Sequence, residues 1–307
     1  MTARTRLAAL LALLPVSAVG LVGCGTDDDP KAADPNDTPS QASPPTGEPT
    51  PTKEPTQTSS DTASPATVAV PIYFVGDTPQ GPRLFREFRQ VEADNPLAEA
   101  VALMVAGDAD DPDYRTAYPA GSFADVSFSE GAGAIVVQVK DDAWSAPADG
   151  MSKQDAKLAV QQLVYTVQGV QQERLPVLVQ MGSDPVPLFG IPTEGGLKEA
   201  PQNNVLAFVN VTEPSQDALV SGTFTASGVA NSFEATVPWE IRDADGKQVL
   251  KGFATAEGWM DKLYPWESPV DVSSLAPGTY TFVAMTDDPS DGEGKGPTED
   301  TKTITVQ

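Results

Sequence analysis

Residues 95–107 read NPLAEAVALMVAG, which is typical of a complete α-helix with both of its ends. Asn95 fits the N-cap, and Pro96 fits the first helical position, where a missing N–H costs nothing. Apolar residues at positions 97, 101, 104 and 105 recur on one helical face. Gly107 marks the end, because glycine readily adopts the left-handed conformation that closes a helix. The stretch therefore predicts an amphipathic helix that packs against a core.

The segments around this helix predict an α+β block. A second helix is expected from the capping box of Ser152 and Asp155 to about Gln168. Five other segments read as strands: 69–75, 83–90, 123–129, 134–140 and 175–181. We expect the two helices to cover one face of a mainly antiparallel sheet, in a domain that extends over residues 67–200.

From residue 205 onward the helical periodicity disappears. Seven strand candidates follow at short intervals, at 205–211, 219–226, 233–242, 247–254, around 266–272, 279–286 and 300–306. Between two of them, residues 243–246 read DADG, a typical hairpin turn. This pattern predicts an all-β, immunoglobulin-like sandwich over residues 201–307, without the inter-sheet disulfide of antibody domains.

The N-terminus predicts an acylated lipoprotein. Arg4 and Arg6 precede an apolar run from Leu7 to about Gly20, and the sequence then reads Leu21-Val22-Gly23-Cys24, a lipobox that contains the only cysteine. We expect residues 1–23 to be a cleaved signal peptide and Cys24 to be acylated, for example with palmitate. The alternative is a secreted protein with an incidental free cysteine. Acylation would anchor the chain in the lipid bilayer, on the extracytoplasmic face of the cell membrane.

Residues 24–66 predict a disordered tether. They are rich in Pro, Thr, Ser and Asp and contain no large apolar residue, so burial cannot offset the entropy cost of ordering them. As a flexible coil, a tether of this length spans roughly 35–40 Å, enough to hold the domains clear of the membrane.

Composition excludes several functions. The net charge of −24 makes nucleic acid an improbable partner, since phosphate binding needs clustered Lys and Arg. With no histidine, the chain can form neither a Ser-His-Asp triad nor a histidine-containing zinc site. An enzyme would be left with carboxylate chemistry or an oxygen-ligated metal. We expect no catalytic residue, no cofactor and no metal.

Short motifs resemble a known family. Four in the first block resemble the GerMN domain of bacterial germination lipoproteins: 72–75, 100–107, 118–122 and 159–167. Three in the second resemble the immunoglobulin-like domain that accompanies GerMN: 220–222, 233–237 and 242–246. The whole chain resembles a GerMN-domain lipoprotein of the actinobacterial type. The resemblance implies the fold expected above, but it brings no catalytic motif.

The segment 257–267 is the candidate ligand site. It reads EGWMDKLYPWE and concentrates the aromatic residues Trp259, Tyr264 and Trp266 beside carboxylates. Aromatic faces suit sugar rings, and adjacent acids suit their hydroxyl groups, so cell-wall glycan is the ligand considered. The alternative is that the tryptophans belong to the sandwich core. The acidic loops at 108–113 and 287–293 invite a calcium interpretation, but solvated turns explain them more simply.

These observations favour a non-enzymatic lipoprotein that acts as a binding or scaffold module in the cell envelope. Its partner would be a cell-wall component or an envelope protein. One alternative is a carboxylate-dependent peptidoglycan hydrolase. Another is an accessory lipoprotein of an envelope transport or signalling system, although the chain lacks the two α/β lobes of a substrate-binding protein.

Overall fold

The computed structural model describes residues 66–288 and 293–307. The signal peptide, Cys24 and almost all of the tether expected from the sequence lie outside these residues. The described residues all belong to one compact unit that spans residues 61–307. Among them, no helix has both the length and the apolar character needed to cross a bilayer.

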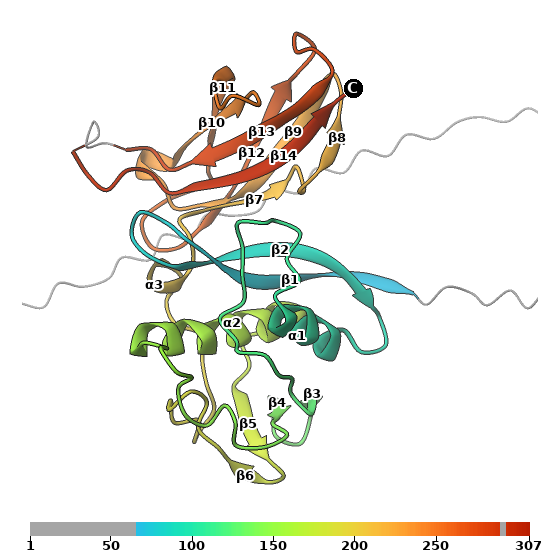
Figure 1. Cartoon of the computed structure of the whole chain (residues 1–307), viewed down its shortest axis with the longest axis vertical. Coiled ribbons are helices and arrows are strands. Elements are labelled where there is room, and N and C mark those ends of the chain that lie inside the picture. The colour runs from blue at the N-terminus through green and yellow to red at the C-terminus, as the bar shows by residue number, and fades with distance from the viewer. Residues whose placement is uncertain (1–65, 289–292) are drawn as a thin grey trace, which may run out of the picture. The chain divides into compact units, whose positions relative to one another are not determined.

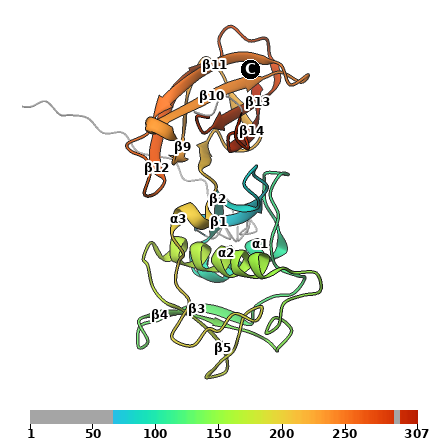
Figure 2. The ribbon, with the colours of Figure 1, turned by 90° about the vertical axis from the view of Figure 1, so that its left-hand side faces the viewer.

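The α+β region contains the first eight elements. They are β1 (Thr67–Gly76), β2 (Arg83–Glu92), α1 (Pro96–Ala106), β3 (Asp125–Ser129), β4 (Ala134–Gln138), α2 (Lys153–Gln171), β5 (Val177–Met181) and β6 (Asp184–Pro185). Strands β1 and β2 form an antiparallel hairpin, whereas the other four form a sheet in the order β3-β4-β5-β6. Figures 1 and 2 show α1 and α2 between the hairpin and this sheet.

The α+β class is confirmed, but the layering differs from the arrangement expected. The helices lie between two separate sheets, where one sheet covered on one face was expected. Strands β4 and β5 are parallel, because the chain runs through α2 between them and returns in the same direction. The remaining pairs of both sheets are antiparallel.

The helix ends follow the sequence signals closely. At the start of α2, the Ser152 hydroxyl accepts a hydrogen bond from the Asp155 N–H, and the Asp155 carboxylate accepts one from the Ser152 N–H. This confirms the capping box. Gly107 closes α1 in the left-handed conformation, with φ of 70°. Asn95 occupies the N-cap position of α1, but its side chain makes no capping hydrogen bond.

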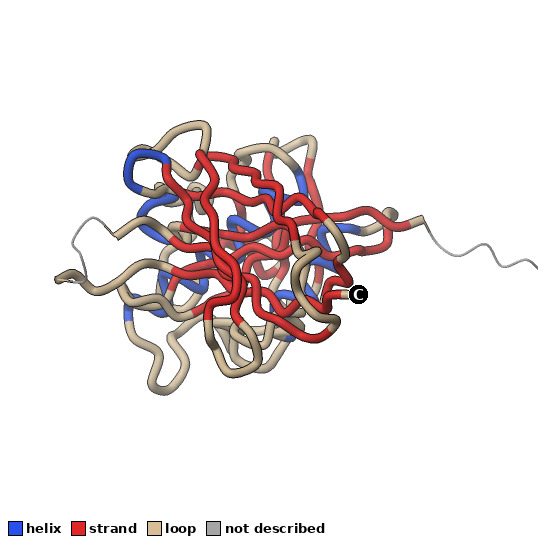
Figure 3. Tube along the Cα trace, turned by 90° about the horizontal axis from the view of Figure 1, so that it is seen from above, coloured by secondary structure: helices blue, strands red, loops and turns tan. Residues whose placement is uncertain are grey.

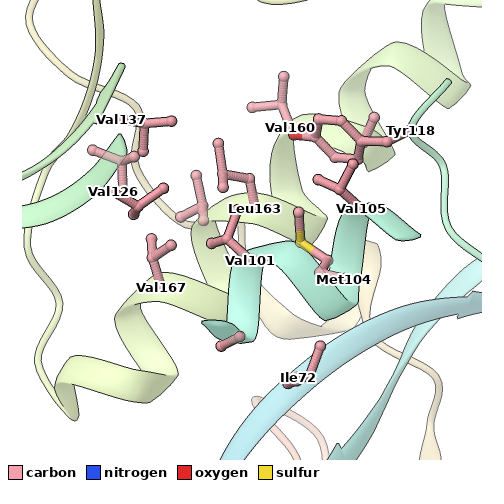
Figure 4. Close-up of a cluster of buried hydrophobic side chains, with 14 of the residues drawn as sticks. Ile72, Val101, Met104, Val105, Tyr118, Val126, Val137, Val160, Leu163 and Val167 are labelled. Atoms are coloured by element: carbon pink, nitrogen blue, oxygen red, sulfur yellow. The ribbon is translucent and has the colours of Figure 1, made fainter. Parts of the chain in front are cut away.

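The core of the α+β region fills the space between the two helices and both sheets (Figure 4). Val101, Met104 and Val105 of α1 face Val160 and other apolar residues of α2. Ile72 closes the core from the hairpin side, and Val126 and Val137 close it from the sheet side. The predicted apolar face of the first helix is therefore the face that packs.

The sandwich follows the short helix α3 (Gln202–Val205). Its strands are β7 (Val209–Glu213), β8 (Ala218–Val220), β9 (Thr223–Ala230), β10 (Thr236–Arg242), β11 (Gln248–Thr255), β12 (Tyr264–Asp271), β13 (Gly278–Met285) and β14 (Glu299–Val306). One sheet has the order β11-β10-β13-β14-β8, and the other has the order β12-β9-β7. In Figure 3, strands dominate the face of the molecule turned to the viewer.

The sandwich predicted from the sequence is confirmed, with local differences. The segment expected as one strand at 219–226 is divided into β8 and β9 around Gly222. Residues 202–205 are helical, and a 3-10 turn at Phe233–Ala235 precedes β10. Residues 243–246 form the turn between β10 and β11, as expected. There the Asp243 carboxylate accepts hydrogen bonds from the N–H groups of Asp245 and Lys247.

A third apolar cluster connects the α+β region with the sandwich. It joins Val75 of β1 and Leu84 of β2 to Leu206, beside α3, and to Leu263, just before β12. The backbone strengthens the connection, since the Ala207 N–H donates to the carbonyl oxygen of Leu84 at 2.9 Å. The two regions thus share a buried apolar contact in addition to having a core each.

Candidate interaction surface and buried charge cluster

The three aromatic residues singled out from the sequence do not share one surface. Trp266 is 3% exposed and belongs to the sandwich core. Its ring packs directly against Gly228, where an added Cβ would lie 3.0 Å from the indole. Trp259 is 37% exposed. Tyr264 lies between these extremes, with its hydroxyl donating to the Asp261 carboxylate at 2.7 Å. The alternative that the tryptophans belong to the sandwich core therefore holds for Trp266.

The loop that carries Trp259 is held by a clamp of asparagine side chains. Asn231 accepts a hydrogen bond from the Met260 N–H at 2.7 Å and donates to the Met260 carbonyl oxygen at 3.2 Å. Asn203 donates to the same carbonyl oxygen at 2.7 Å. Met260 has φ of 88°, which is unusual for a residue with a side chain. The clamp thus fixes Met260 in a strained conformation, with 67% of its surface exposed.

Phe233 completes an exposed apolar surface beside this loop. The Phe233 and Trp259 rings meet edge to face, with centroids 5.2 Å apart and planes at 77°. After Phe233, both Glu234 and Ala235 have positive φ values, of 50° and 60°. We call Phe233, Trp259 and Met260 the aromatic platform. The sequence singled out Trp259 within the segment 257–267, which also contains Met260, but it did not indicate Phe233, because no local pattern shows that residues 233 and 259 meet.

A buried charge cluster lies where the α+β region meets the sandwich. Lys302 of β14 is 3% exposed, and its ammonium donates to Asp111 Oδ2 at 2.6 Å, Asp300 Oδ1 at 3.0 Å and the Tyr114 hydroxyl at 2.9 Å. The Tyr114 hydroxyl in turn donates to Asp300 Oδ1 at 2.7 Å. The second oxygen of Asp300 accepts the N–H of Val211 at 2.6 Å. All three protons of the ammonium therefore have acceptors.

Glu87 extends the cluster on the side of β2. Its carboxylate accepts hydrogen bonds from the N–H groups of Asp110 and Asp111, at 3.0 and 2.8 Å. Arg89 lies nearby and forms ion pairs with Asp108 at 3.6 Å and with Asp110 at 3.3 Å. The acidic loop at 108–113 thus binds groups of the protein itself, which explains its charges without calcium.

Burial sets the protonation behaviour of the cluster. Desolvation raises the pKa of Asp111 and of Glu87, although hydrogen bonds and Lys302 oppose the shift. Desolvation by itself lowers the pKa of Lys302, but the Asp300 and Asp111 carboxylates outweigh it and raise the pKa above its ordinary value. Burial, reinforced by the charges of Asp300 and Asp111, raises the pKa of Tyr114. Lys302 therefore stays charged over the physiological range.

Two other groups of acidic residues have the composition of a metal site. The carboxylate oxygens of Glu92, Asp94 and Glu99 lie within 4.8 Å of one another. However, the Glu99 carboxylate already accepts the Glu92 N–H at 2.6 Å, and exposed acidic groups of this kind are common without an ion. The loop at 287–293 falls mostly outside the described residues, so its calcium interpretation stays a hypothesis.

Comparisons with known proteins agree with this architecture. Residues 71–183 match the family described as "Sporulation and spore germination", and residues 208–293 match the "Immunoglobulin-like domain of bacterial spore germination". No curated protein matches the chain.

Two of the solved structures that align with this chain are the following. The tandem GerMN domains of the sporulation protein GerM from Bacillus subtilis align over 68% of this chain, with 13% identity and a TM-score of 0.36. The alignment covers 62% of the GerM chain, which is less than two thirds of its length. CopC from Methylosinus trichosporium OB3b aligns over 32% of this chain and 93% of its own, with 23% identity and a TM-score of 0.22.

The family matches carry the assignment, since each falls on one of the two folded regions described above. The chain is therefore a germination-like protein in which a GerMN domain is followed by the immunoglobulin-like domain of bacterial spore germination.

Proposed function

We propose that the protein is a membrane-anchored, extracytoplasmic lipoprotein that acts as a binding module in the cell envelope. The aromatic platform would contact a cell-wall component or an envelope protein, and the joined domains would present it at the end of the tether. The observation that carries this proposal is the platform itself, where three apolar side chains are exposed on a backbone held in unusual conformations.

Backbone strain supports an interaction role for the platform. Left-handed conformations at residues with side chains cost about 1–3 kcal/mol each and persist where the surroundings impose them, often at functional sites. Here the Asn231 clamp imposes one of them at Met260. Exposed aromatic residues on a backbone that is held in place suit recognition, because they lose little side-chain entropy on binding.

The buried charge cluster supports a non-enzymatic role. A hydrolase needs one carboxyl group that can give a proton and another that can accept one or attack the substrate. In the cluster, Asp111 and Asp300 are both occupied by Lys302, and Glu87 accepts two backbone N–H groups. Asp111 and Asp300 join the two domains through Lys302, and Glu87 holds the loop that carries Asp111.

Anchoring through Cys24 is part of the proposal and rests on the sequence. Replacing Cys24 with Ala removes the thiol that acylation needs, so the protein should be released or stay as an unprocessed precursor. Metabolic labelling with an alkyne fatty acid measures this directly. Label on the Cys24→Ala variant would contradict the anchoring.

Binding by the platform is tested with purified cell wall and with crosslinking in the native cell. Trp259→Ala should reduce sedimentation with the wall, or remove a crosslinked partner, while the melting temperature stays within a few degrees. Phe253→Ala is the matched control, because Phe253 is an exposed aromatic residue of β11 with no ring contact to the platform among the described residues. If the two variants behave alike in both assays, the platform is not the contact surface.

A further inference from the structure

A cavity of about 450 Å³ lies at the edge of the GerMN domain, beside α3, and is not lined by any residue of the platform or the charge cluster. It opens between the turn of the β1–β2 hairpin, the first half of α2 and the chain around α3. Figures 1 and 2 show α3 lying between the hairpin and α2. The volume falls within the usual range of small-molecule sites.

The wall of this cavity combines apolar side chains with positive charge. Leu158, Leu197 and Val205 contribute apolar surface, and Arg83 and Lys157 contribute two cations. Glutamine and asparagine side chains supply further polar groups, but none of the described residues that line the cavity is an Asp or a Glu. This is unusual in a chain with 43 acidic residues and only 19 basic ones.

Neither cation has a carboxylate partner among the described residues. Four other cations, Arg89, Arg115, Arg242 and Lys302, form ion pairs with acids. Arg83 is half-buried, donates one hydrogen bond to the Asn203 carbonyl oxygen at 2.7 Å and lies 4.9 Å from the centre of the Phe208 ring. Burial lowers the pKa of Arg83, as expected for a partly dehydrated cation that lacks a counter-charge.

We propose that this cavity binds a small amphiphilic anion, namely an aliphatic chain that ends in a carboxylate. The apolar wall would bury the chain, and the head would pair with Lys157 and with the free N–H groups of Arg83, whose planar fork matches a carboxylate. Charge complementarity selects this occupant over a neutral one. The inference is independent of the proposed function, since it needs neither the anchor nor the platform.

The test is calorimetric titration of the full chain, dissolved without lipid, with sodium octanoate below its micellar concentration and with buffer as the blank. Octanoate should bind the protein, and octanamide, the neutral analogue of the same length, should bind at least about fivefold more weakly. Lys157→Glu should weaken octanoate binding about fivefold, because attraction is replaced by repulsion at a solvent-exposed position. Lys157 is exposed, so the variant should fold normally.

Lys153→Glu is the matched control. Lys153 is exposed and lies one turn earlier in α2, but it does not line the cavity. It should bind octanoate within twofold of the wild type. Absence of octanoate binding, equal binding of octanamide, or equal effects of the two lysine variants would each overturn the proposal. If a short peptide with a free C-terminal carboxylate bound and octanoate did not, the occupant would be a peptide end and the proposed ligand class would be wrong.

Discussion

Lys302 lies at the centre of the buried charge cluster between the two domains. Burying an ammonium group costs several kcal/mol, and here two carboxylates and a tyrosine hydroxyl from both sides of the contact compensate it. Removing one member of such a cluster is costly because the remaining charges stay buried. The cluster therefore positions the two domains relative to each other, whatever its net contribution to stability.

Lys302→Met is expected to lower the free energy of unfolding by about 3–5 kcal/mol near neutral pH, since Asp111 and Asp300 lose their buried cation. The pH dependence has a definite sign. The folded-state pKa of Lys302 is raised above the ordinary 10.5, so its contribution is complete below pH 10.5 and is lost as the pH rises through the folded-state pKa. The stability difference between wild type and variant should thus shrink in alkali.

Urea unfolding followed by circular dichroism, between pH 7 and pH 12, measures this difference. Lys153→Met is the control, because Lys153 is exposed and makes no ion pair among the described residues. Its stability difference from the wild type should be small at every pH. A constant difference for Lys302→Met across the range would mean that the pKa of Lys302 is the same in the folded and unfolded states, so that the cluster does not favour its charged form.

Replacing each of the two buried tryptophans of the sandwich with phenylalanine should lower the free energy of unfolding by different amounts. Trp239 Nε1 donates to the Ser268 hydroxyl at 2.9 Å, whereas Trp266 Nε1 is buried with no partner among the described residues. Trp239→Phe therefore loses a hydrogen bond, while Trp266→Phe removes an unsatisfied donor. We expect Trp239→Phe to be the more destabilising by about 1 kcal/mol. Guanidinium unfolding of both variants measures this, and the reverse order would contradict the hydrogen-bond assignment.

Among the elements, α2 has a better-defined beginning than α1, because Ser152 caps α2 whereas Asn95 makes no capping hydrogen bond. Ser152→Ala removes the hydroxyl that caps the Asp155 N–H and should cost about 1 kcal/mol. Ser274→Ala is a suitable control, since Ser274 is exposed and its hydroxyl makes no hydrogen bond among the described residues. Thermal unfolding of the two serine variants compares their melting temperatures. Equal melting temperatures would show that the cap contributes little beside the packing of α2.

Short sequence patterns predicted the ends of those elements that depend only on residues next to each other in the chain. The Ser152–Asp155 capping box, the Gly107 terminus and the turn at 243–246 all appear where the sequence places them, because each depends on neighbouring residues only. The parallel pairing of β4 with β5 and the position of the helices between two sheets depend on contacts distant in sequence. Hydrophobic periodicity identifies the face of an element that packs, but it does not identify the element against which that face packs.

The candidate sites were less predictable for the same reason. The aromatic segment was visible in the sequence, but an exposed Trp259 and a buried Trp266 look alike without the strand register. The pairing of Trp266 with Gly228 decides which face of β12 is buried. The charge cluster was not predicted at all, because Lys302 and Asp111 are 191 positions apart. Acidic loops are too frequent in this chain for one of them to suggest a buried partner.

Over the described part of the molecule, two buried clusters help to hold the GerMN domain against the immunoglobulin-like domain. One is the buried charge cluster, and the other is the apolar cluster around Leu84 and Leu206. The linker is also held, since the Tyr165 hydroxyl and the Gln161 side chain bond to Ala200. Such a junction leaves little freedom for hinge motion.

This junction predicts that the two domains unfold together. In scanning calorimetry the wild type should show a single transition with a calorimetric enthalpy close to the van't Hoff enthalpy. Leu206→Ala should cost about 2–5 kcal/mol and lower the temperature of the whole transition, because the side chain is buried among residues of both domains. Leu219→Ala, at an exposed position of β8, should leave it nearly unchanged. Two resolved transitions in the wild type, with only one shifted by Leu206→Ala, would mean that the domains are independent and that the charge cluster does not couple them.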